Sequence, residues 1–385
     1  MSRLRILALE PYYGGSHRAV LDGLVAHVDA DWTLLTLPAR KWKWRMRGAA
    51  ITMAEQAASL LADTAGTADP ARHEPQPSPP RNAAGIAPFN LIFASTFVNL
   101  AEFRGLVGMP LAAVPAIVYF HENQLVYPNR HTAEWDYQFP LTNITSALSA
   151  DRCIFNTQWN LDQFVGAIPG FIREFPDHHP TGLAERIAEK SQVIHPPFDP
   201  AVFEETPVVR GERARIAWPH RWEHDKNPEA FFSAVAELAD EGLNFEVVVA
   251  GQAFRDVPQV IVDAEHVLGD RLVHLGEPAT REEYATLLAG SDIAVSTADN
   301  EFFGLAMVEA AFAGCWPLVP DRLAYPEIYP AEMRYSTREQ LVARLRSRIL
   351  NRPAPGSAYE LAACYTLEAL APSFDAAFNE VARAR

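Results

Sequence analysis

The feature that most constrains the fold is an alternation of short apolar runs with longer segments of helical periodicity. Runs rich in β-branched and apolar residues recur along the chain, and each is followed by a segment long enough for a helix. This order is typical of parallel sheets whose faces are covered by helices. The sequence therefore predicts two doubly wound α/β domains. We expect their strands at residues 5–9, 32–37, 90–94, 116–120 and 152–156, and then at residues 215–218, 245–250, 272–275, 293–296 and 316–319.

The length of 385 residues and an apolar content of 49% are sufficient for two separate cores. We expect a first domain at residues 1–200 and a second at residues 201–364. They are linked by the proline-containing stretch at residues 193–203, where regular structure is discouraged. Residues 64–85 are rich in Pro, Ala and polar side chains with almost nothing to bury, which predicts a mobile surface insertion.

Composition and charge exclude several classes of protein. The longest apolar stretch, residues 106–120, is interrupted by Pro110 and Pro115, so no segment reaches membrane-spanning length. The first residues lead directly into the first expected strand, which indicates no cleavable signal peptide. Three widely separated cysteines argue against a disulfide framework or a zinc site and fit a reducing cytoplasm. A formal net charge of −15 disfavours indiscriminate nucleic-acid binding, so a polyanion would need a local basic patch.

Two polar motifs follow strands of the first domain, where open α/β sheets bind ligands. "EPYYGGSHR" follows the first strand: Gly14 and Gly15 permit a tight turn, and Ser16 is expected to cap the helix that follows. "YFHENQ" places His121 and the polar residues 122–124 at the end of the fourth strand. A plain strand-to-helix turn explains the glycines equally well, and for His121 a structural role stays open beside a catalytic one.

The second domain has a motif of the same kind after its first strand. In "AWPHRWEHDKNPEAFF", Asn227 and Pro228 indicate an N-cap and a first helical position. Arg221 and Lys226 then lie in the loop above the sheet. Two cations there suit a diphosphate whose negative charge grows as it leaves. The alternative is a solvated loop that carries charges of both signs.

The segment "STADNEFFGLAMVEAAFAGCWPLVP" carries Glu301 and Glu309, eight residues apart. Gly304 is expected to open a helix, which leaves Glu301 in the preceding loop and puts Glu309 within the helix. The backbone N–H groups of Phe303, Gly304 and Leu305 would then face phosphates at the positive end of the helix. The two carboxylates are expected to contact different parts of one ligand.

Taken together, these motifs resemble the retaining nucleotide-sugar glycosyltransferases of the GT-B fold, in which two Rossmann-like domains face a cleft. The resemblance spans nearly the whole chain. It implies that the second domain binds the nucleotide sugar, with Arg221 and Lys226 gripping its diphosphate. It also implies that Glu301 contacts the transferred sugar and that Glu309 contacts the ribose hydroxyls.

The same resemblance assigns further features of the chain. His121 matches an active-site histidine near the donor sugar, and Gly14 and Gly15 match a glycine loop beside the phosphates. Retention of the anomeric configuration is ascribed in these enzymes to front-face attack assisted by the departing phosphate, without a protein nucleophile. No metal and no cofactor beyond the nucleotide sugar is implied. Residues 365–385 are expected to form a helix that crosses back onto the first domain.

A closer resemblance is carried by the first half of the chain. "PYYGGSHR", "TLPARKWKWRMRGAA", "FASTFVNLAEFRGL" and "YFHENQLVYP" with "YQFPLTNITSALSADRCIFNTQWNLDQF" are similar to the tRNA-queuosine alpha-mannosyltransferase family. That family transfers mannose from GDP-mannose to the cyclopentene-diol of queuosine in the anticodon of tRNA-Asp. The resemblance therefore implies a nucleotide sugar and a tRNA as partners, with no membrane and no protein partner.

An unusual basic segment has a use in such an enzyme. Within "PARKWKWRMRG", five basic side chains and two tryptophans occupy eight positions of an acidic chain: Arg40, Lys41, Trp42, Lys43, Trp44, Arg45 and Arg47 with Met46 between the last two. Together with Glu122, Asn123 and Gln124, these residues are expected on the acceptor side. The cations would engage RNA phosphates while one tryptophan stacks on an unpaired base. A half-buried edge strand or the start of an amphipathic helix is the structural alternative, and packed tryptophans with free cations would combine the two.

Two other functions remain open from the sequence. One is a GT-B glycosyltransferase that uses another nucleotide sugar and a small-molecule or lipid-linked acceptor. The other is a non-catalytic module that binds a nucleotide or RNA, which the combination of basic, acidic and histidine side chains at the strand ends disfavours. The salt dependence of RNA binding separates the first from a tRNA enzyme, and donor hydrolysis excludes the second.

Overall fold

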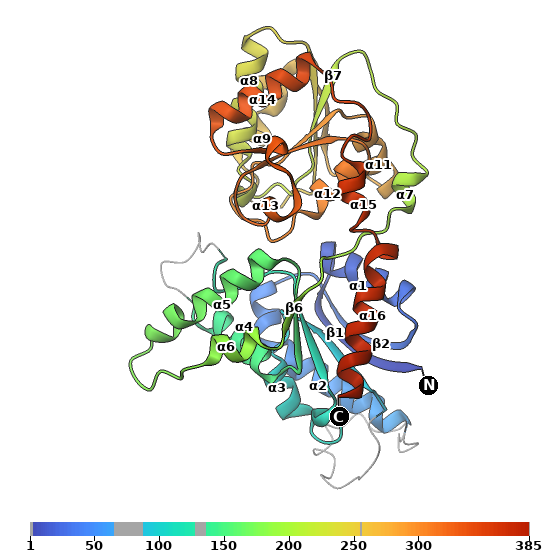
Figure 1. Cartoon of the computed structure of the whole chain (residues 1–385), viewed down its shortest axis with the longest axis vertical. Coiled ribbons are helices and arrows are strands. Elements are labelled where there is room, and N and C mark those ends of the chain that lie inside the picture. Colours follow the sequence, from blue (N-terminus) through green and yellow to red (C-terminus); the bar gives the residue numbers. More distant parts are fainter. Residues whose placement is uncertain (1–2, 65–87, 128–135, 255, 385) are drawn as a thin grey trace. The chain divides into compact units, whose positions relative to one another are not determined.

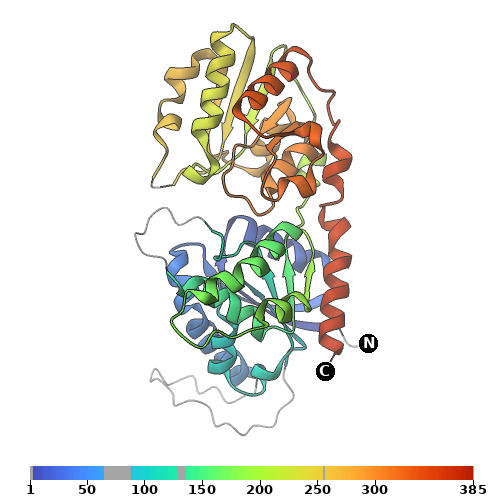
Figure 2. The same cartoon turned by 60° about the vertical axis from the view of Figure 1, so that its left-hand side comes forward.

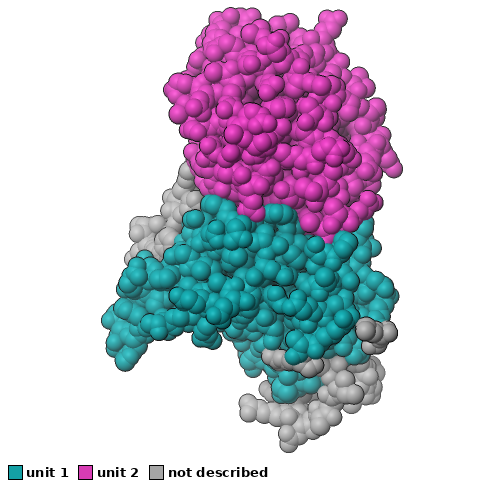
Figure 3. Space-filling view, viewed as in Figure 1, with its two compact units in different colours: residues 1–195, 371–385 teal, residues 196–370 magenta. Residues whose placement is uncertain are grey.

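The computed structural model describes residues 3–64, 88–127, 136–254 and 256–384, and the expected insertion lies outside these ranges apart from its first residue. The chain divides into two units (Figures 1 and 3). Unit 1 comprises Met1–His195 and Ala371–Arg385, and unit 2 comprises Pro196–Leu370. The change from one unit to the other thus falls within the proline-containing stretch at residues 193–203.

Unit 1 is built on a six-stranded parallel sheet in the order β2-β1-β3-β4-β5-β6. Its strands are β1 (Leu4–Tyr13), β2 (Ala30–Pro38), β3 (Leu91–Ser95), β4 (Ala116–Phe120), β5 (Arg152–Phe155) and β6 (Ser191–Val193). Successive side chains of a strand point to opposite faces. In β1, Leu7 and Leu9 accordingly enter one core while Ile6 and Ala8 enter the other. Both faces of this sheet are buried, which explains the continuous apolar runs.

Helices cover both faces of the sheet of unit 1. One face packs against α1 (Gly15–His27) and the greater part of α16 (Leu367–Arg383). The other face carries α2 (Trp42–Thr64), α3 (Leu100–Val107), η1 (Leu111–Ala113), α4 (Gln138–Ser149), α5 (Gln158–Arg173) and α6 (Leu183–Ala188). Figure 2 shows α16, in red, running along the part of the chain that contains this sheet. The end of the chain thus contributes buried side chains, among them Phe374 and Phe378, to the core of unit 1.

Unit 2 is built on a second six-stranded parallel sheet in the order β12-β11-β10-β7-β8-β9. Its strands are β7 (Ala214–Trp218), β8 (Phe245–Ala250), β9 (Leu272–Gly276), β10 (Ile293–Val295), β11 (Trp316–Pro320) and β12 (Arg334–Tyr335). One face packs against α8 (Pro228–Asp240), α9 (Gln259–Val262), α10 (Ala264–Leu268) and α14 (Arg338–Leu350). The other face packs against α7 (Ala201–Glu204), α11 (Arg281–Ala289), α12 (Leu305–Phe312), α13 (Tyr325–Ile328) and α15 (Tyr359–Ala363).

The alternation of apolar runs and helical segments predicted this architecture correctly. Each of the ten expected strands overlaps a strand of the structure, and both sheets are doubly wound. The prediction missed the edge strands β6 and β12, because these strands are short and β6 is only half-buried, so neither forms an apolar run. Within the described residues, no helix combines the length and apolar character needed to cross a membrane.

Candidate functional site

The strand order of each sheet reverses at one point, and ligands of open α/β sheets bind outside the carboxyl ends of the strands at such a point. In unit 1 the reversal lies between β1 and β3, and in unit 2 it lies between β7 and β10. The loops that follow these strands therefore define one candidate site in each unit. They contain most of the residues that the sequence singled out.

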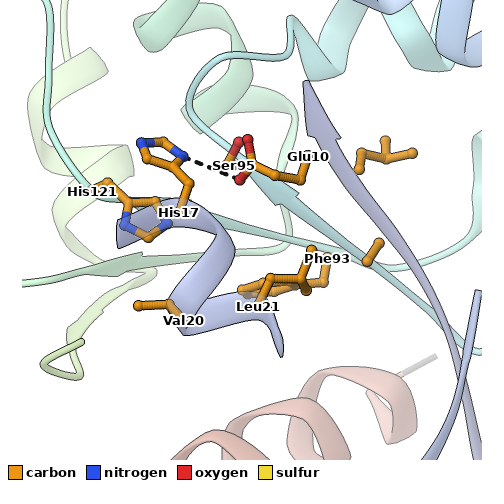
Figure 4. A pocket seen from close by; sticks show the side chains of 9 residues that line it. Glu10, His17, Val20, Leu21, Phe93, Ser95 and His121 are labelled. Atoms are coloured by element: carbon orange, nitrogen blue, oxygen red, sulfur yellow. Dashed lines mark hydrogen bonds and ion pairs between the residues drawn. The ribbon is translucent and has the colours of Figure 1, made fainter. Parts of the chain in front are cut away.

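The site of unit 1 is a cluster of two carboxylates and two imidazoles, of which Figure 4 shows Glu10, His17 and His121. His17, in the first turn of α1, has Nδ1 3.1 Å from Oε2 of Glu10 and Nε2 3.4 Å from Oε2 of Glu122. The ring of His17 stacks on that of His121, with centroids 3.9 Å apart and an interplanar angle of 26°. The ends of β1 and β4 and the start of α1 thus bring together residues that are distant in the sequence.

The two histidines of this cluster have opposite protonation. Burial alone would lower the pKa of His17, but the carboxylates of Glu10 and Glu122 outweigh it and raise the pKa to about 10. Burial, with the charge of His17 beside it, holds the pKa of His121 well below its ordinary value. At neutral pH the site therefore contains an imidazolium at His17 and a neutral imidazole at His121.

Glu10, His17 and His121 are also close enough to be considered as metal ligands, since their ligand atoms lie within 4.8 Å of one another. A protonated His17 donates from both ring nitrogens to carboxylates. It then has no lone pair for a metal. In this protonation state Glu10, His17 and Glu122 form a hydrogen-bonded ion-pair network.

Asn123 and Gln124, expected to contact the acceptor, have different surroundings. Asn123 is fully buried; its amide donates to Oδ1 of Asn160 at 2.7 Å, and its Oδ1 accepts from the N–H of Leu125. It therefore holds the loop after β4 in place and offers no exposed group to an acceptor. The half-buried Gln124 is fixed through its backbone N–H, which donates to Oδ1 of Asn143, so its side chain remains a candidate contact.

The glycine turn before α1 differs from the expectation in one respect. The helix begins at Gly15 with Gly14 as its N-cap and no side-chain capping bond, so the prediction that Ser16 caps the helix is wrong. A Cβ on Gly14 would lie 2.5 Å from Cβ of Ala39, and Gly15 adopts a φ of +52°. Close approach of the chain after β2 and a left-handed backbone therefore account for the two glycines.

Lys226 forms the centre of the site in unit 2. It ends the turn η2 (His224–Lys226) after β7 and is 6% exposed. Its Nζ donates to the carbonyl of Asn300 at 2.8 Å and lies 3.2 Å from Oδ2 of Asp225 and 3.4 Å from Oε2 of Glu301. Buried charges require such pairing. The fold thus joins the loops after β7 and β10 through one ammonium group.

Arg221 lies in the same loop but in a different environment. Its side chain is half-exposed, with Nη2 3.0 Å from Oε2 of Glu223 and the guanidinium 5.9 Å from the ring centroid of Phe254. An exposed ion pair of this kind contributes about 0–1 kcal/mol, so exchanging Glu223 for an anionic ligand costs little.

Glu301 is a carboxylate in this site. Burial alone would raise its pKa, but Lys226 and His220 lower it below the ordinary value. Its Oε1 accepts from the N–H groups of Phe302 at 3.1 Å and Phe303 at 3.4 Å. The N–H of Phe303, expected to face a phosphate, is thus directed at Glu301.

The helix after Glu301 begins where the sequence predicted it. Gly304 is the N-cap of α12 and Leu305 is its first residue, so Glu301 precedes the helix and Glu309 lies within it. Gly304 adopts a φ of +89°, and a Cβ there would lie 2.9 Å from Cε1 of Tyr325. Backbone conformation and packing therefore both require glycine at this position.

Glu309 has a partner that sequence reasoning missed. The guanidinium of Arg281, at the start of α11, donates to Oε1 of Glu309 at 2.6 Å and to Oε2 at 3.4 Å. The same guanidinium lies 5.1 Å from the ring centroid of Phe203 and 5.2 Å from that of Tyr284. Arg281 thus fixes the orientation of the Glu309 carboxylate. The guanidinium of Arg281 stays accessible, because this side chain is half-exposed.

The tryptophans of the basic segment differ in their environment at the start of α2. Trp42 packs on Phe139, with ring centroids 5.1 Å apart, and joins a small core. Trp44 is 64% exposed. A Cβ on Gly48 would lie 3.0–3.2 Å from the ring atoms of Trp44, so the indole rests on the helix backbone one turn further on. The segment is therefore a helix start with one packed and one exposed ring.

The cations of this segment also fall into two groups. Arg45 donates to the carbonyl of Pro38 at 3.3 Å, and Arg47 pairs with Asp136. The exposed cations that have no ion-pair partner among residues of described placement are Arg40, Lys41 and Lys43. The alternative of packed tryptophans with free cations therefore holds only in part, because Trp44 is exposed and Arg47 is paired.

Comparison with known families follows the same division of the chain. The family model described as tRNA-queuosine alpha-mannosyltransferase N-terminal matches residues 5–198, and that described as glycosyl transferases group 1 matches residues 204–333. A tRNA-queuosine alpha-mannosyltransferase from Drosophila melanogaster is 38% identical over an alignment of 353 residues that covers 88% of this chain and 85% of the relative. The chain belongs to the tRNA-queuosine alpha-mannosyltransferase family. It is a glycosyltransferase of the hexosyltransferase class.

Solved structures with low sequence identity confirm the fold of this family member. HepE from Anabaena, in complex with UDP, has a TM-score of 0.67 at 13% identity and covers 98% of this chain and 100% of its own. Sucrose-phosphate synthase from Thermosynechococcus elongatus has a TM-score of 0.67 at 14% identity, with 100% of both chains covered. At sequence identities in this range, the structural similarity is evidence for the α/β GT-B fold and for nothing more specific.

Sequence reasoning missed several polar residues of the two sites: Glu10, His17, Asp225, Arg281 and Asn300. Glu10 and His17 stand in the quoted motif "EPYYGGSHR", and the acidic residue at the end of a buried strand was a usable signal. No sequence signal pointed to Arg281, because this residue contacts Glu309 only once α11 and α12 are folded into unit 2.

Proposed function

We propose that this enzyme transfers mannose from GDP-mannose to the queuosine base in the anticodon of tRNA-Asp, with retention of the anomeric configuration. The observation that carries the proposal is the convergence of Arg221, Lys226 and Glu301 at the carboxyl ends of β7 and β10 in a member of this family. Cations and a fixed carboxylate at that place suit a sugar diphosphate. The name of the Drosophila relative supports the acceptor and the sugar.

In the proposed reaction the bond from the anomeric carbon to the diphosphate oxygen breaks and a bond to an acceptor hydroxyl oxygen forms. The hydroxyl proton passes to an oxygen of the departing diphosphate. Arg221 and Lys226 stabilise the negative charge of that leaving group. Glu301 accepts hydrogen bonds from sugar hydroxyls, and Glu309, oriented by Arg281, accepts them from the ribose.

His121 contributes as a neutral imidazole near the donor sugar. Its low pKa keeps it uncharged at working pH. A neutral ring can both donate and accept a hydrogen bond. This suits a sugar hydroxyl better than an imidazolium, which only donates.

Unit 1 contributes the contact with RNA in this proposal. Lys41 and Lys43 approach phosphates while the exposed ring of Trp44 stacks on an unpaired base. The whole chain has a formal net charge of −15, which repels RNA, so this local basic patch determines which surface RNA can approach.

The test is transfer of labelled mannose from GDP-mannose to bulk tRNA that contains queuosine, compared with tRNA from cells that lack it. We expect label only in the queuosine-containing sample. Donor hydrolysis without label in either tRNA would retain the glycosyltransferase and point to another acceptor. The absence of both donor hydrolysis and transfer with GDP-mannose would contradict the proposed donor.

A further inference from the structure

His17 is held on both sides by carboxylates from other elements of unit 1. Glu10 comes from β1 and Glu122 from the loop after β4, and each faces a different ring nitrogen of His17. The remaining oxygens are also engaged: Oε1 of Glu10 accepts from the N–H of Tyr12 at 2.8 Å, and Oε1 of Glu122 accepts from Oγ1 of Thr96 at 3.4 Å. Carboxylates that are themselves fixed leave the imidazolium little freedom to rotate.

His121 depends on this clamp for its own orientation. Its ring stacks on His17 on one side, and Tyr119 approaches at a centroid distance of 4.6 Å and an interplanar angle of 79°. Across the part of the chain with described placement, no protein group hydrogen-bonds the ring nitrogens of His121. The ring is therefore positioned by packing, and it lines a small cavity together with Ser95 (Figure 4).

The groups around His121 come from four places in unit 1. They are the His17 imidazolium on α1, the Glu10 carboxylate on β1, the Glu122 carboxylate on the adjoining loop, and the Tyr119 phenol on β4. Tyr119 donates to the carbonyl of Ile194, and burial raises its pKa, so it stays uncharged. Ser95, the last residue of β3, and Thr96, which follows it, are polar and uncharged.

We infer that His17 is a positioning residue of the transfer site: held between Glu10 and Glu122 and stacked on His121, it fixes the ring plane of His121 and keeps that ring neutral. This inference rests on the proposed function, because it assumes that His121 acts on the sugar. His17 itself touches no reacting atom. The positive charge of His17 acts on the stacked ring of His121, because two like charges at this distance repel each other and protonation of His121 is disfavoured.

The consequence is a pH dependence with a definite sign. His17 stays charged up to a pKa of about 10, so its repulsion of a second proton is present throughout the neutral range. Without that charge, the carboxylates of Glu10 and Glu122 act on His121 and favour its protonation. Removal of His17 should therefore move the protonation of His121 toward neutral pH and reduce activity on the acid side.

The experiment combines His17→Gln and His17→Phe with the control His27→Gln, at the other end of the same helix. Histidine labelled with ¹⁵N reports the protonation of His121 by NMR without any substrate, and kcat/KM for transfer is measured from pH 5 to 9. We expect the pKa of His121 to rise by about one unit or more in both His17 variants. The acid limb of kcat/KM should shift by the same amount, and the control should match the wild type. The Phe variant retains a stacked ring without charge, and the Gln variant retains a donor to the carboxylates, so either variant that folds tests the inference.

The outcomes separate the inference from the proposed function. An unchanged protonation of His121 in folded His17 variants would overturn the inference, whatever the enzyme transfers. A shifted protonation with an unshifted acid limb would also overturn it, because the ring would then not govern the reaction. Absence of transfer in the wild type, with the NMR shift intact, would instead contradict the proposed reaction.

Discussion

At the residue scale, the two cations of the donor site, Lys226 and Arg221, have different roles because their surroundings differ. Lys226 is buried and holds the loops after β7 and β10 together, so its removal would leave Asp225 and Glu301 without their counter-ion. Arg221 is half-exposed, and its ion pair with Glu223 lies at the surface. A change at Arg221 therefore reports on ligand binding with little effect on folding, whereas a change at Lys226 reports on both.

Arg221→Ala should lower kcat/KM for transfer by about 30- to 1,000-fold, equivalent to about 2–4 kcal/mol of transition-state stabilisation. The reason is that the leaving diphosphate loses a positioned cation. The melting temperature should stay within about 1 °C, because exposed ion pairs contribute little. Arg338→Ala, which removes a similarly exposed arginine paired with Glu237 in the same unit, is the control. Retained kcat/KM in Arg221→Ala would exclude the assigned role.

At the element scale, the first turn of α2 combines a structural ring and an exposed one. Trp42 and Trp44 are two positions apart in the helix, so they point away from each other. Met46, Phe97 and Phe139 surround the first. The second lies over Gly48, which leaves one face of the indole open. An element can thus be anchored by one aromatic side chain while presenting the next to a ligand.

Trp44→Ala should weaken binding of tRNA by about 1–3 kcal/mol, the range for stacking of a base on an aromatic ring. Its unfolding free energy should change by less than about 0.5 kcal/mol, because the ring is exposed. Trp42→Ala should show the reverse pattern, with a loss of about 2 kcal/mol in stability. Filter binding and urea denaturation measure the two quantities. Equal affinity in wild type and Trp44→Ala would remove the proposed stacking.

At the scale of the whole molecule, the end of the chain completes the fold of its beginning. One face of the sheet of unit 1 packs against two helices, α1 and α16. The residues of α16 from Ala371 on belong to unit 1, although unit 2 separates them from the rest of unit 1 in the sequence. Two of the largest side chains on that face, Phe374 and Phe378, belong to α16. This face of unit 1 can therefore be fully buried only after the residues of α16 have been synthesised.

Phe374→Ala should destabilise unit 1 by about 3–5 kcal/mol, because it removes a fully buried ring from a packed core. Ser373→Ala, one position away on the exposed side of α16, should have little effect and serves as control. Denaturation followed by circular dichroism should show an earlier transition in the first variant alone. Identical transitions in the two variants would mean that α16 contributes no stability to unit 1.

The sequence by itself determined the class of fold and the local geometry of several site residues. Periodicity of apolar residues is a local property, so ten strands could be placed without the structure. The N-cap of α8 at Asn227 and the start of α12 after Gly304 were predicted for the same reason, since capping depends on a few adjacent residues.

Only the tertiary structure decided which side chains meet. Glu10, His17, His121 and Glu122 come from three separate segments of unit 1, and Arg281 reaches Glu309 across two helices of unit 2. Burial, which distinguishes Trp42 from Trp44 and fixes Asn123 inside a loop, is likewise a property of the packed chain. The pKa values of the two stacked histidines diverge because packing places His17 between carboxylates and buries His121 beside a cation, and no local pattern of residues encodes that arrangement.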